Sequence, residues 1–511
     1  MSENVGMSTA SERSILIALA ALAMAGVVAR AHVQAITIDE AVSYSNFVHP
    51  AEPAFWTALA NNHLLHSMLA WTFARIFNPS HLAVRSAALV GAAVYIAASG
   101  FLSTLIAQRF PLRVFLFICL VFNPLILDFL VAARGYGLAS GFLLSAICFV
   151  GSALMPGENT RRVAKACVAA SLCVALSFLS NFSFAFVDAA TIVMLYVWAC
   201  GGESPRRRAM LAAACFLPGL IVAGAVAGPV ILHWQQSELN YGAASLQETF
   251  ASLYQASFYE LRPAVKELLF IDVPAPSILM PILALFAAWR ASLVLVHWRS
   301  FPDARARWLP VFAAVLVVAV AAALGMHWLL FRLMRVPLPK DRTGIYIVIL
   351  ATLFAGVLAA IPIPTRTGEI TRRGMTILML AVGLYFLLCL RLHYFKEWKW
   401  DADADKLYSV LASYNHACGL RDIAVDWRYD AALNYYRNAS GRETLPEFVR
   451  SRELPPGKRA YVLYEPEDHD FLANHSLSIV YRTPYDAVIA LNPQVEDSGN
   501  PCPIKPPDPG K

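Results

Sequence analysis

The chain has 511 residues, of which 58% are hydrophobic and 15% are charged, and its mean hydropathy is +0.54. This composition excludes an ordinary soluble globular protein and predicts a polytopic membrane protein. The formal net charge is +6, but most Lys and Arg residues stand in short connections between apolar runs. That placement is typical of membrane orientation rather than of nucleic-acid binding.

A transmembrane helix needs about 20 mainly apolar residues, and the sequence contains eleven such runs. They are 14–34, 82–106, 112–131, 137–155, 163–179, 182–200, 209–233, 274–296, 309–331, 344–362 and 376–393. The first is long enough to span and is followed by no convincing cleavage site, so we expect an anchor rather than a signal peptide. The pattern predicts an all-α polytopic membrane bundle of about eleven transmembrane helices, over residues 1–393.

Basic residues are concentrated in every second connection between these runs. They occupy 109–113, 161–165, 206–208, 299–307 and 366–373. Because cytoplasmic loops are enriched in Lys and Arg, we predict a multi-pass protein of the cell inner (plasma) membrane with a cytoplasmic N-terminus. The first loop, 36–80, and everything after residue 393 then face outward.

The first outer loop opens with two adjacent carboxylates, Asp39 and Glu40. Its segments 50–62 and 63–77, and the later outer segment 234–272, have helical spacing with apolar faces, which predicts interfacial helices. Ionisable side chains at a membrane face are costly unless they have a function. The acidic pair is therefore the first candidate for chemistry.

Residues 394–511 are richer in charged and aromatic side chains. Short apolar strands at 422–427, 460–464, 477–481 and 487–491 alternate with helical patterns, which predicts a small C-terminal α/β extracytoplasmic domain with a Pro-rich tail. Cys418 and Cys502 are the only cysteines of this region. Their position favours a disulfide if the compartment is oxidising, but the sequence leaves open whether they form one.

Five segments, taken in order, resemble a known family. They are IDEAVSY (38–44), NNHLLHSML (61–69), LAVRSAAL (82–89), VAARGYGLASG (131–141) and PLPKDRTGIYIVIL (337–350). They resemble integral-membrane glycosyltransferases that use polyprenyl-phosphate-linked sugars, the group with the C-type glycosyltransferase fold that includes the protein O-mannosyltransferases and the lipid A aminoarabinose transferase. The resemblance implies a multi-span fold with the catalytic acid in its first outer loop, a sugar donor on polyprenyl phosphate, and a lipid, glycan or protein acceptor at the outer face.

Transfer from such a donor needs a base that deprotonates the acceptor hydroxyl, and a partly desolvated carboxylate is suited to this task. Asp39 occupies the family's acid position, so we predict that it is the general base of an inverting displacement. Glu40 is the second catalytic candidate. It points elsewhere if the segment is helical, and it orients the acceptor, binds a metal, or only supplies charge at a helix N-terminus.

The leaving lipid phosphate needs fixed cations or hydrogen-bond donors around its developing charge. Arg134 and Tyr136, after the third run, and Lys340 and Arg342, before the tenth, are the candidates. Arg suits bidentate contact with phosphate. The alternative is that the basic side chains only snorkel at helix ends and that Tyr136 belongs to an aromatic belt.

Asn62, His63 and His66 are further candidates for substrate binding, and the two histidines lie about one helical turn apart. We favour hydrogen bonding to the sugar over metal coordination, so we expect no metal or other cofactor, although the pair could bind a divalent metal together with a carboxylate. Two other functions stay open. A transporter or flippase of a lipid-linked sugar would more naturally show paired repeats and broken helices, and a non-catalytic scaffold would only present the C-terminal domain.

Overall fold

The structure is a computed structural model that describes residues 10–50, 52, 59, 62–77, 80–155, 160–233, 241–259, 261, 263–269, 276–440, 445–451, 453–495 and 502. The chain divides into two compact units. The first, called here the helical unit, comprises Met1–Val28, Trp56–His66 and Ser86–Leu390. The second, called here the C-terminal unit, comprises Ala29–Phe55, Ser67–Arg85 and Arg391–Lys511. It therefore includes much of the first loop in addition to the predicted C-terminal domain.

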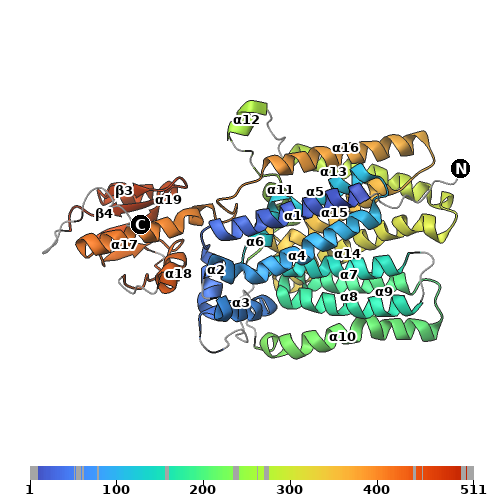
Figure 1. Cartoon of the computed structure of the whole chain (residues 1–511), viewed down its shortest axis with the longest axis horizontal. Helices are drawn as coiled ribbons and strands as arrows, with labels where there is room; N and C mark the ends of the chain where they lie inside the picture. The colour runs from blue at the N-terminus through green and yellow to red at the C-terminus, as the bar shows by residue number, and fades with distance from the viewer. Residues whose placement is uncertain are drawn as a thin grey trace. The chain divides into compact units, whose positions relative to one another are not determined.

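The helical unit is built from long apolar helices (Figure 1). The helices that form it or enter it are α1 (Ala10–Val33), α4 (His81–Ile106), α5 (Phe110–Val121), α6 (Pro124–Val131), α7 (Tyr136–Ala153), α8 (Thr160–Ser180), α9 (Ala185–Ala199), α10 (Pro205–Ile231), α13 (Pro276–Val296), α14 (Ala304–Met334), α15 (Ile345–Ala360) and α16 (Arg366–Leu388). Within the described residues, nine helices are long and apolar enough to span a membrane, and the bent pair α5 and α6 adds a tenth. The remaining predicted run, 274–296, coincides with α13. The predicted helical membrane bundle is confirmed.

The third predicted run differs from the expectation because it is broken. Helix α5 ends at Val121, and α6 continues at an angle of 57° to it. The side-chain oxygen of Asn123 accepts the backbone N–H of Leu125 at 2.9 Å and so caps α6. Pro124 has no N–H and disfavours a helical backbone in the residue before it, so a single straight helix cannot form here.

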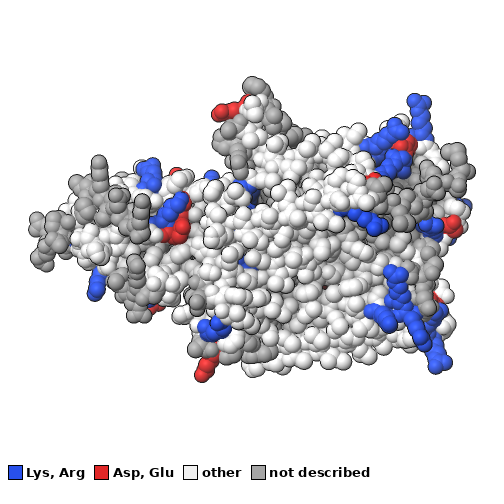
Figure 2. Space-filling model, in the orientation of Figure 1, with Lys and Arg blue, Asp and Glu red and all other residues white. Residues whose placement is uncertain are grey.

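Lys and Arg side chains gather at one end of the helical unit (Figure 2). The amino ends of α8, α10, α14 and α16 lie at this end (Figure 1), and their exposed cations include Arg161, Lys165, Arg206 and Arg373. The opposite end holds the start of α7 and the last residues of α8 and α14. This asymmetry is the pattern that the topology prediction requires, and the sidedness itself stays a prediction.

Short helices accompany the long ones, as the interfacial patterns predict. Helix α3 (Leu64–Phe77) occupies the segment predicted at 63–77, whereas the predicted helix at 50–62 falls largely outside the described residues. Within 234–272 the structure describes α11 (Leu246–Ser257) and α12 (Pro263–Leu269). Helix α11 packs against the segment that precedes α15, so it is an element that positions residues of the predicted site.

The C-terminal unit contains a four-stranded sheet with the order β1-β2-β4-β3. Its elements are α2 (Ile38–Ser43), the π-helix η1 (Tyr44–Val48), η6 (Lys399–Asp403), α17 (Ala404–Cys418), β1 (Ile423–Val425), α18 (Asp430–Ser440), β2 (Ala460–Tyr464), α19 (Glu465–Asn474), β3 (Ser478–Arg482) and β4 (Ala487–Leu491). Strand β1 is parallel to β2, and the other two pairs are antiparallel. All four predicted strands are present. Cys418 and Cys502 form a disulfide with their Cα atoms 5.2 Å apart, and the rest of the Pro-rich tail lies outside the described residues.

Candidate functional site

Helix α2 carries the predicted acidic pair in the C-terminal unit. The Thr37 hydroxyl accepts the backbone N–H of Glu40, and the Glu40 carboxylate accepts the backbone N–H of Thr37 at 3.0 Å. This reciprocal capping box explains why a short helix begins at this point. Asp39 is half-buried and Glu40 is fully buried, so the two neighbouring carboxylates have different surroundings.

Glu40 forms a buried ion pair with Arg85. The Arg85 Nε and Nη2 atoms donate to the two Glu40 oxygens at 2.8 and 2.6 Å, and neither side chain is exposed to solvent. Arg85 also donates to the carbonyl oxygens of Ala31, Gln34 and Ala35 at the end of α1. A helix leaves its last carbonyls without intrahelical partners, so Arg85 fastens the end of α1 to the start of α2.

Asp401 is an acid that the sequence analysis did not select. Its side chain is buried, and its Oδ2 atom accepts the backbone N–H of Ile38 at 2.7 Å, directly before Asp39. Burial raises the pKa of Asp401 well above its usual range, and the charges of Asp39, Glu40 and Asp430 raise it further. Such repulsion requires proximity, so these four acids form one cluster in the C-terminal unit.

The other predicted site residues all belong to the helical unit. The buried ones are Asn62, His63, His66, Arg134 and Tyr136. The ring of His63 contacts the ring of Tyr136 edge-on, with centroids 5.7 Å apart. Gly135, between Arg134 and Tyr136, has φ +67 and lies beside the Cβ of His63, so this turn requires glycine. The predicted turn and the start of α3 are therefore in contact.

His63 is a buried histidine in a basic environment. Burial lowers its pKa well below the usual range, and Arg134, His66 and Arg342 lower it further. Neither ring nitrogen hydrogen-bonds to another described residue. At neutral pH the imidazole is uncharged, so it has one N–H donor and one acceptor nitrogen with which to bind a ligand.

Because His63 is buried, we predict that His63→Phe changes how the free energy of unfolding depends on pH. The unfolded chain protonates His63 near pH 6.5, whereas the folded chain keeps the ring neutral to a lower pH. Wild-type protein therefore loses stability as the pH falls below about 6.5, and the variant lacks this loss. Between pH 7.5 and 5.5, the free energy of unfolding of wild type should fall relative to the variant by about 1 kcal/mol. Thermal unfolding of both proteins at the two pH values measures this difference, and an equal difference at both values would contradict the prediction.

The basic segment before α15 is held by hydrogen bonds to its neighbours. Ala243 and Leu338 exchange two backbone hydrogen bonds, at 2.7 and 2.9 Å. The Ser252 hydroxyl of α11 accepts the N–H of Asp341 at 3.0 Å. These contacts fix the backbone of η5 (Asp341–Gly344), and with it the direction of the side chains on this segment.

The predicted cations of this segment differ in their partners. The Lys340 Nζ atom lies 2.8 Å from a Glu248 carboxylate oxygen, in a half-exposed ion pair. The Arg342 guanidinium lies over the ring of Tyr241, 4.3 Å from the ring centroid. Its positive charge also lowers the pKa of His63. Arg342 therefore belongs with Arg134 to the cluster around His63, whereas Lys340 is bound to a carboxylate.

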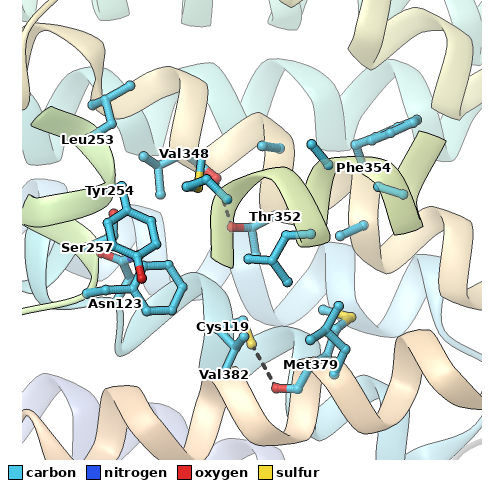
Figure 3. Close-up of a pocket in the computed structure, with 18 of the residues that line it drawn as sticks. Cys119, Asn123, Leu253, Tyr254, Ser257, Val348, Thr352, Phe354, Met379 and Val382 are labelled. Carbon is cyan, nitrogen blue, oxygen red and sulfur yellow. Dashed lines mark hydrogen bonds between the residues drawn. The ribbon is translucent and has the colours of Figure 1, made fainter. Parts of the chain in front are cut away.

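An apolar cavity of about 340 Å³ lies in the helical unit among α5, α11, α13, α15 and α16. Figure 3 shows Asn123, Tyr254 and Ser257 together on one side of it. Leu253 of α11 lines this cavity, and a Cβ atom on Gly344 of η5 would lie 3.0 Å from the Leu253 Cδ2 atom. One helix thus borders both the cavity and the basic segment, so a charged surface and an apolar space are adjacent.

The described residues contain no group of three or more His, Cys, Asp or Glu side chains that could hold a metal ion. His63 and His66 are part of no such group among those residues. The expectation that the site takes no metal or other cofactor stays a prediction.

The chain matches no protein-family model and no curated protein sequence. Its structure is similar to ArnT from Cupriavidus metallidurans bound to undecaprenyl phosphate, at 11% identity and a TM-score of 0.48, over 95% of this chain and 99% of that one. It is also similar to the apo oligosaccharyltransferase of Archaeoglobus fulgidus, at 11% identity and a TM-score of 0.46, over 94% and 74%. A third structure is AglB from Archaeoglobus fulgidus with an inhibitory peptide and a dolichol-phosphate, at 11% identity and 0.46, over 95% and 75%. The ArnT structure holds undecaprenyl phosphate and the AglB structure a dolichol-phosphate. These neighbours belong to the group that the motifs resemble.

Proposed function

We propose that the chain is a membrane glycosyltransferase that moves a sugar from a polyprenyl-phosphate donor to an acceptor hydroxyl at the outer face of the membrane. The observation that carries the proposal is the cluster of Arg134, Arg342 and neutral His63 near an apolar cavity. A lipid phosphate needs both features, because its head group is bound by fixed cations and its chain by apolar surface.

In this mechanism Arg134 and Arg342 bind the phosphate and stabilise the charge that develops on its oxygen as the sugar leaves. Asn62, His63, His66 and Tyr136 donate or accept hydrogen bonds with the sugar and the phosphate. Lys340 adds a positive charge to the site, and its ion pair with Glu248 partly neutralises that charge.

Asp39 takes the proton of the acceptor hydroxyl while that oxygen attacks the anomeric carbon. The bond between the anomeric carbon and the phosphate oxygen breaks in the same step, so the sugar inverts its configuration. The proton ends on Asp39 and the electron pair on the lipid phosphate. Glu40, held by Arg85, positions the helix that carries Asp39.

A flippase of a lipid-linked sugar is the second candidate, because carriers use discontinuous membrane helices and the structure breaks one span between α5 and α6. Two measurements on a deletion strain and its complemented form separate the two functions: mass spectrometry of envelope glycans and lipid-linked sugars, and labelling of intact cells with a membrane-impermeant reagent that reports the leaflet of the donor. A transferase predicts donor exposed on the outer leaflet and a glycan that lacks one sugar. Donor confined to the inner leaflet would indicate a flippase. Unchanged glycans and donors would contradict both functions and favour the non-catalytic scaffold.

Arg342→Ala should weaken the binding of polyprenyl phosphate by about tenfold or more, because a hydrogen bond to a charged group contributes about 1.5–3 kcal/mol. Binding is measured by titrating the lipid phosphate into the purified protein. Arg335→Ala is the matched control, since Arg335 is an exposed cation of the same segment. Equal affinity of Arg342→Ala and wild type would remove Arg342 from the phosphate site.

A further inference from the structure

Helices α4 and α7 approach each other closely at two glycines, Gly91 and Gly141. A Cβ atom on Gly91 would collide with the backbone of Leu138, and one on Gly141 would lie 3.0 Å from the Tyr95 nitrogen. Glycine therefore allows the two backbones to meet here. Beyond this crossing, toward the end of the unit where the cations gather, a groove of about 800 Å³ opens between α4, α7 and α8.

The walls of this groove are mostly apolar. Phe101 of α4 and Phe149 of α7 line it, and 48% and 44% of their surfaces are exposed. The hydroxyls of Ser145 and Ser152 donate to carbonyls of their own helix, so they are satisfied without a ligand. Exposed aromatic side chains on a membrane helix are suited to contact with acyl chains.

Two cations stand on the third wall. Arg162 and Lys165 of α8 line the groove and are exposed. Residues three apart share one helix face, so both charges border the same opening. An apolar groove with two cations is complementary to a lipid that has an anionic head group. A soluble anion would interact only with the two cations, and a neutral lipid would contact only the apolar walls.

We propose that this groove binds one anionic phospholipid from the leaflet on the basic side of the membrane. Its phosphate contacts Arg162 and Lys165, and an acyl chain lies against Phe101 and Phe149. Basic pockets between transmembrane helices bind anionic lipid head groups in this way. The groove shares no lining residue with the cavity among α5, α11, α13, α15 and α16, so the proposal does not depend on the proposed function.

The test is native mass spectrometry of the purified full chain with phosphatidylglycerol or phosphatidylcholine of equal acyl composition. Wild type should retain one phosphatidylglycerol in preference to phosphatidylcholine. The double variant Arg162→Gln and Lys165→Gln should lose this preference, on the order of a tenfold fall in affinity. The matched control is Arg206→Gln with Arg208→Gln, which removes two exposed cations at the same end of the unit, on α10. This control should keep the preference.

A second variant tests the apolar part. Ala97→Trp fills the groove from an exposed position on α4 and changes no charge. It should weaken phosphatidylglycerol binding and abolish the rise in melting temperature that the lipid gives wild type. Equal binding of the two lipids to wild type would overturn the proposal, and so would equal losses in both double variants, which indicate general surface attraction. Unchanged phosphatidylglycerol binding by Ala97→Trp would overturn the assignment to the groove.

Discussion

Asp39→Asn should lower the rate of sugar transfer by at least about 100-fold, the usual contribution of a general base. Asn has the shape of Asp but cannot take a proton at neutral pH. The cations proposed to bind the donor are unchanged, so donor affinity should stay near that of wild type. The measurement is single-turnover transfer by the purified protein from the lipid-linked sugar that accumulates in the deletion strain, together with titration of polyprenyl phosphate.

Stability separates this loss from a folding defect. The charge of Asp39 raises the pKa of the buried Asp401, so removing the charge relieves repulsion and should leave the melting temperature equal or higher. Glu52→Gln is the matched control, because Glu52 is an exposed carboxylate of the same loop, and its turnover should equal that of wild type. Full turnover in Asp39→Asn would exclude Asp39 as the base.

The sequence predicts the helical bundle and the four strands well, because both follow from the length and composition of short apolar runs. A run of spanning length can be only a helix or a barrel strand in a membrane, because every backbone polar group must be satisfied there. The continuous apolar runs at 460–464 and 487–491 are typical of short strands that are buried on both faces. The break in the third run also had a local signal, since Asn123 and Pro124 are a cap and a helix breaker.

The partners within the site are less predictable, because they depend on contacts between distant segments. Arg85 was visible as a cation in an apolar run, and such a residue needs a partner. Nothing in the spacing indicates that the partner is Glu40, or that Asp401 binds the backbone beside Asp39. The partner of Lys340 is equally hidden in the sequence, because Glu248 belongs to α11, a distant segment of the chain. Sequence patterns identify the charged residues that are costly to bury. Only the fold shows which hydrogen bonds and ion pairs offset that cost.

Glu40→Gln is expected to reduce the free energy of unfolding by about 3–5 kcal/mol, the cost of leaving one partner of a buried ion pair. Glutamine keeps the size of the side chain and can still accept the Thr37 N–H. It leaves the Arg85 guanidinium, with no exposed surface, without a counter-charge. Thermal or denaturant unfolding in detergent measures the loss. Arg109→Gln is the contrast, since it breaks a 3.6 Å pair with Glu369 in which the Arg109 side chain is 59% exposed, and should cost about 0–1 kcal/mol.

The same variant tests whether Glu40 positions α2 or takes part in the chemistry. If it positions α2, the folded fraction of Glu40→Gln transfers sugar at a rate far closer to wild type than Asp39→Asn, because the base is intact. If turnover falls as far as in Asp39→Asn while the melting temperature is unchanged, Glu40 acts in the chemical step. Replacing both Glu40 and Arg85 by Leu should restore only part of the stability. The buried charges are then gone, but three carbonyls at the end of α1 have lost the donor that Arg85 supplied.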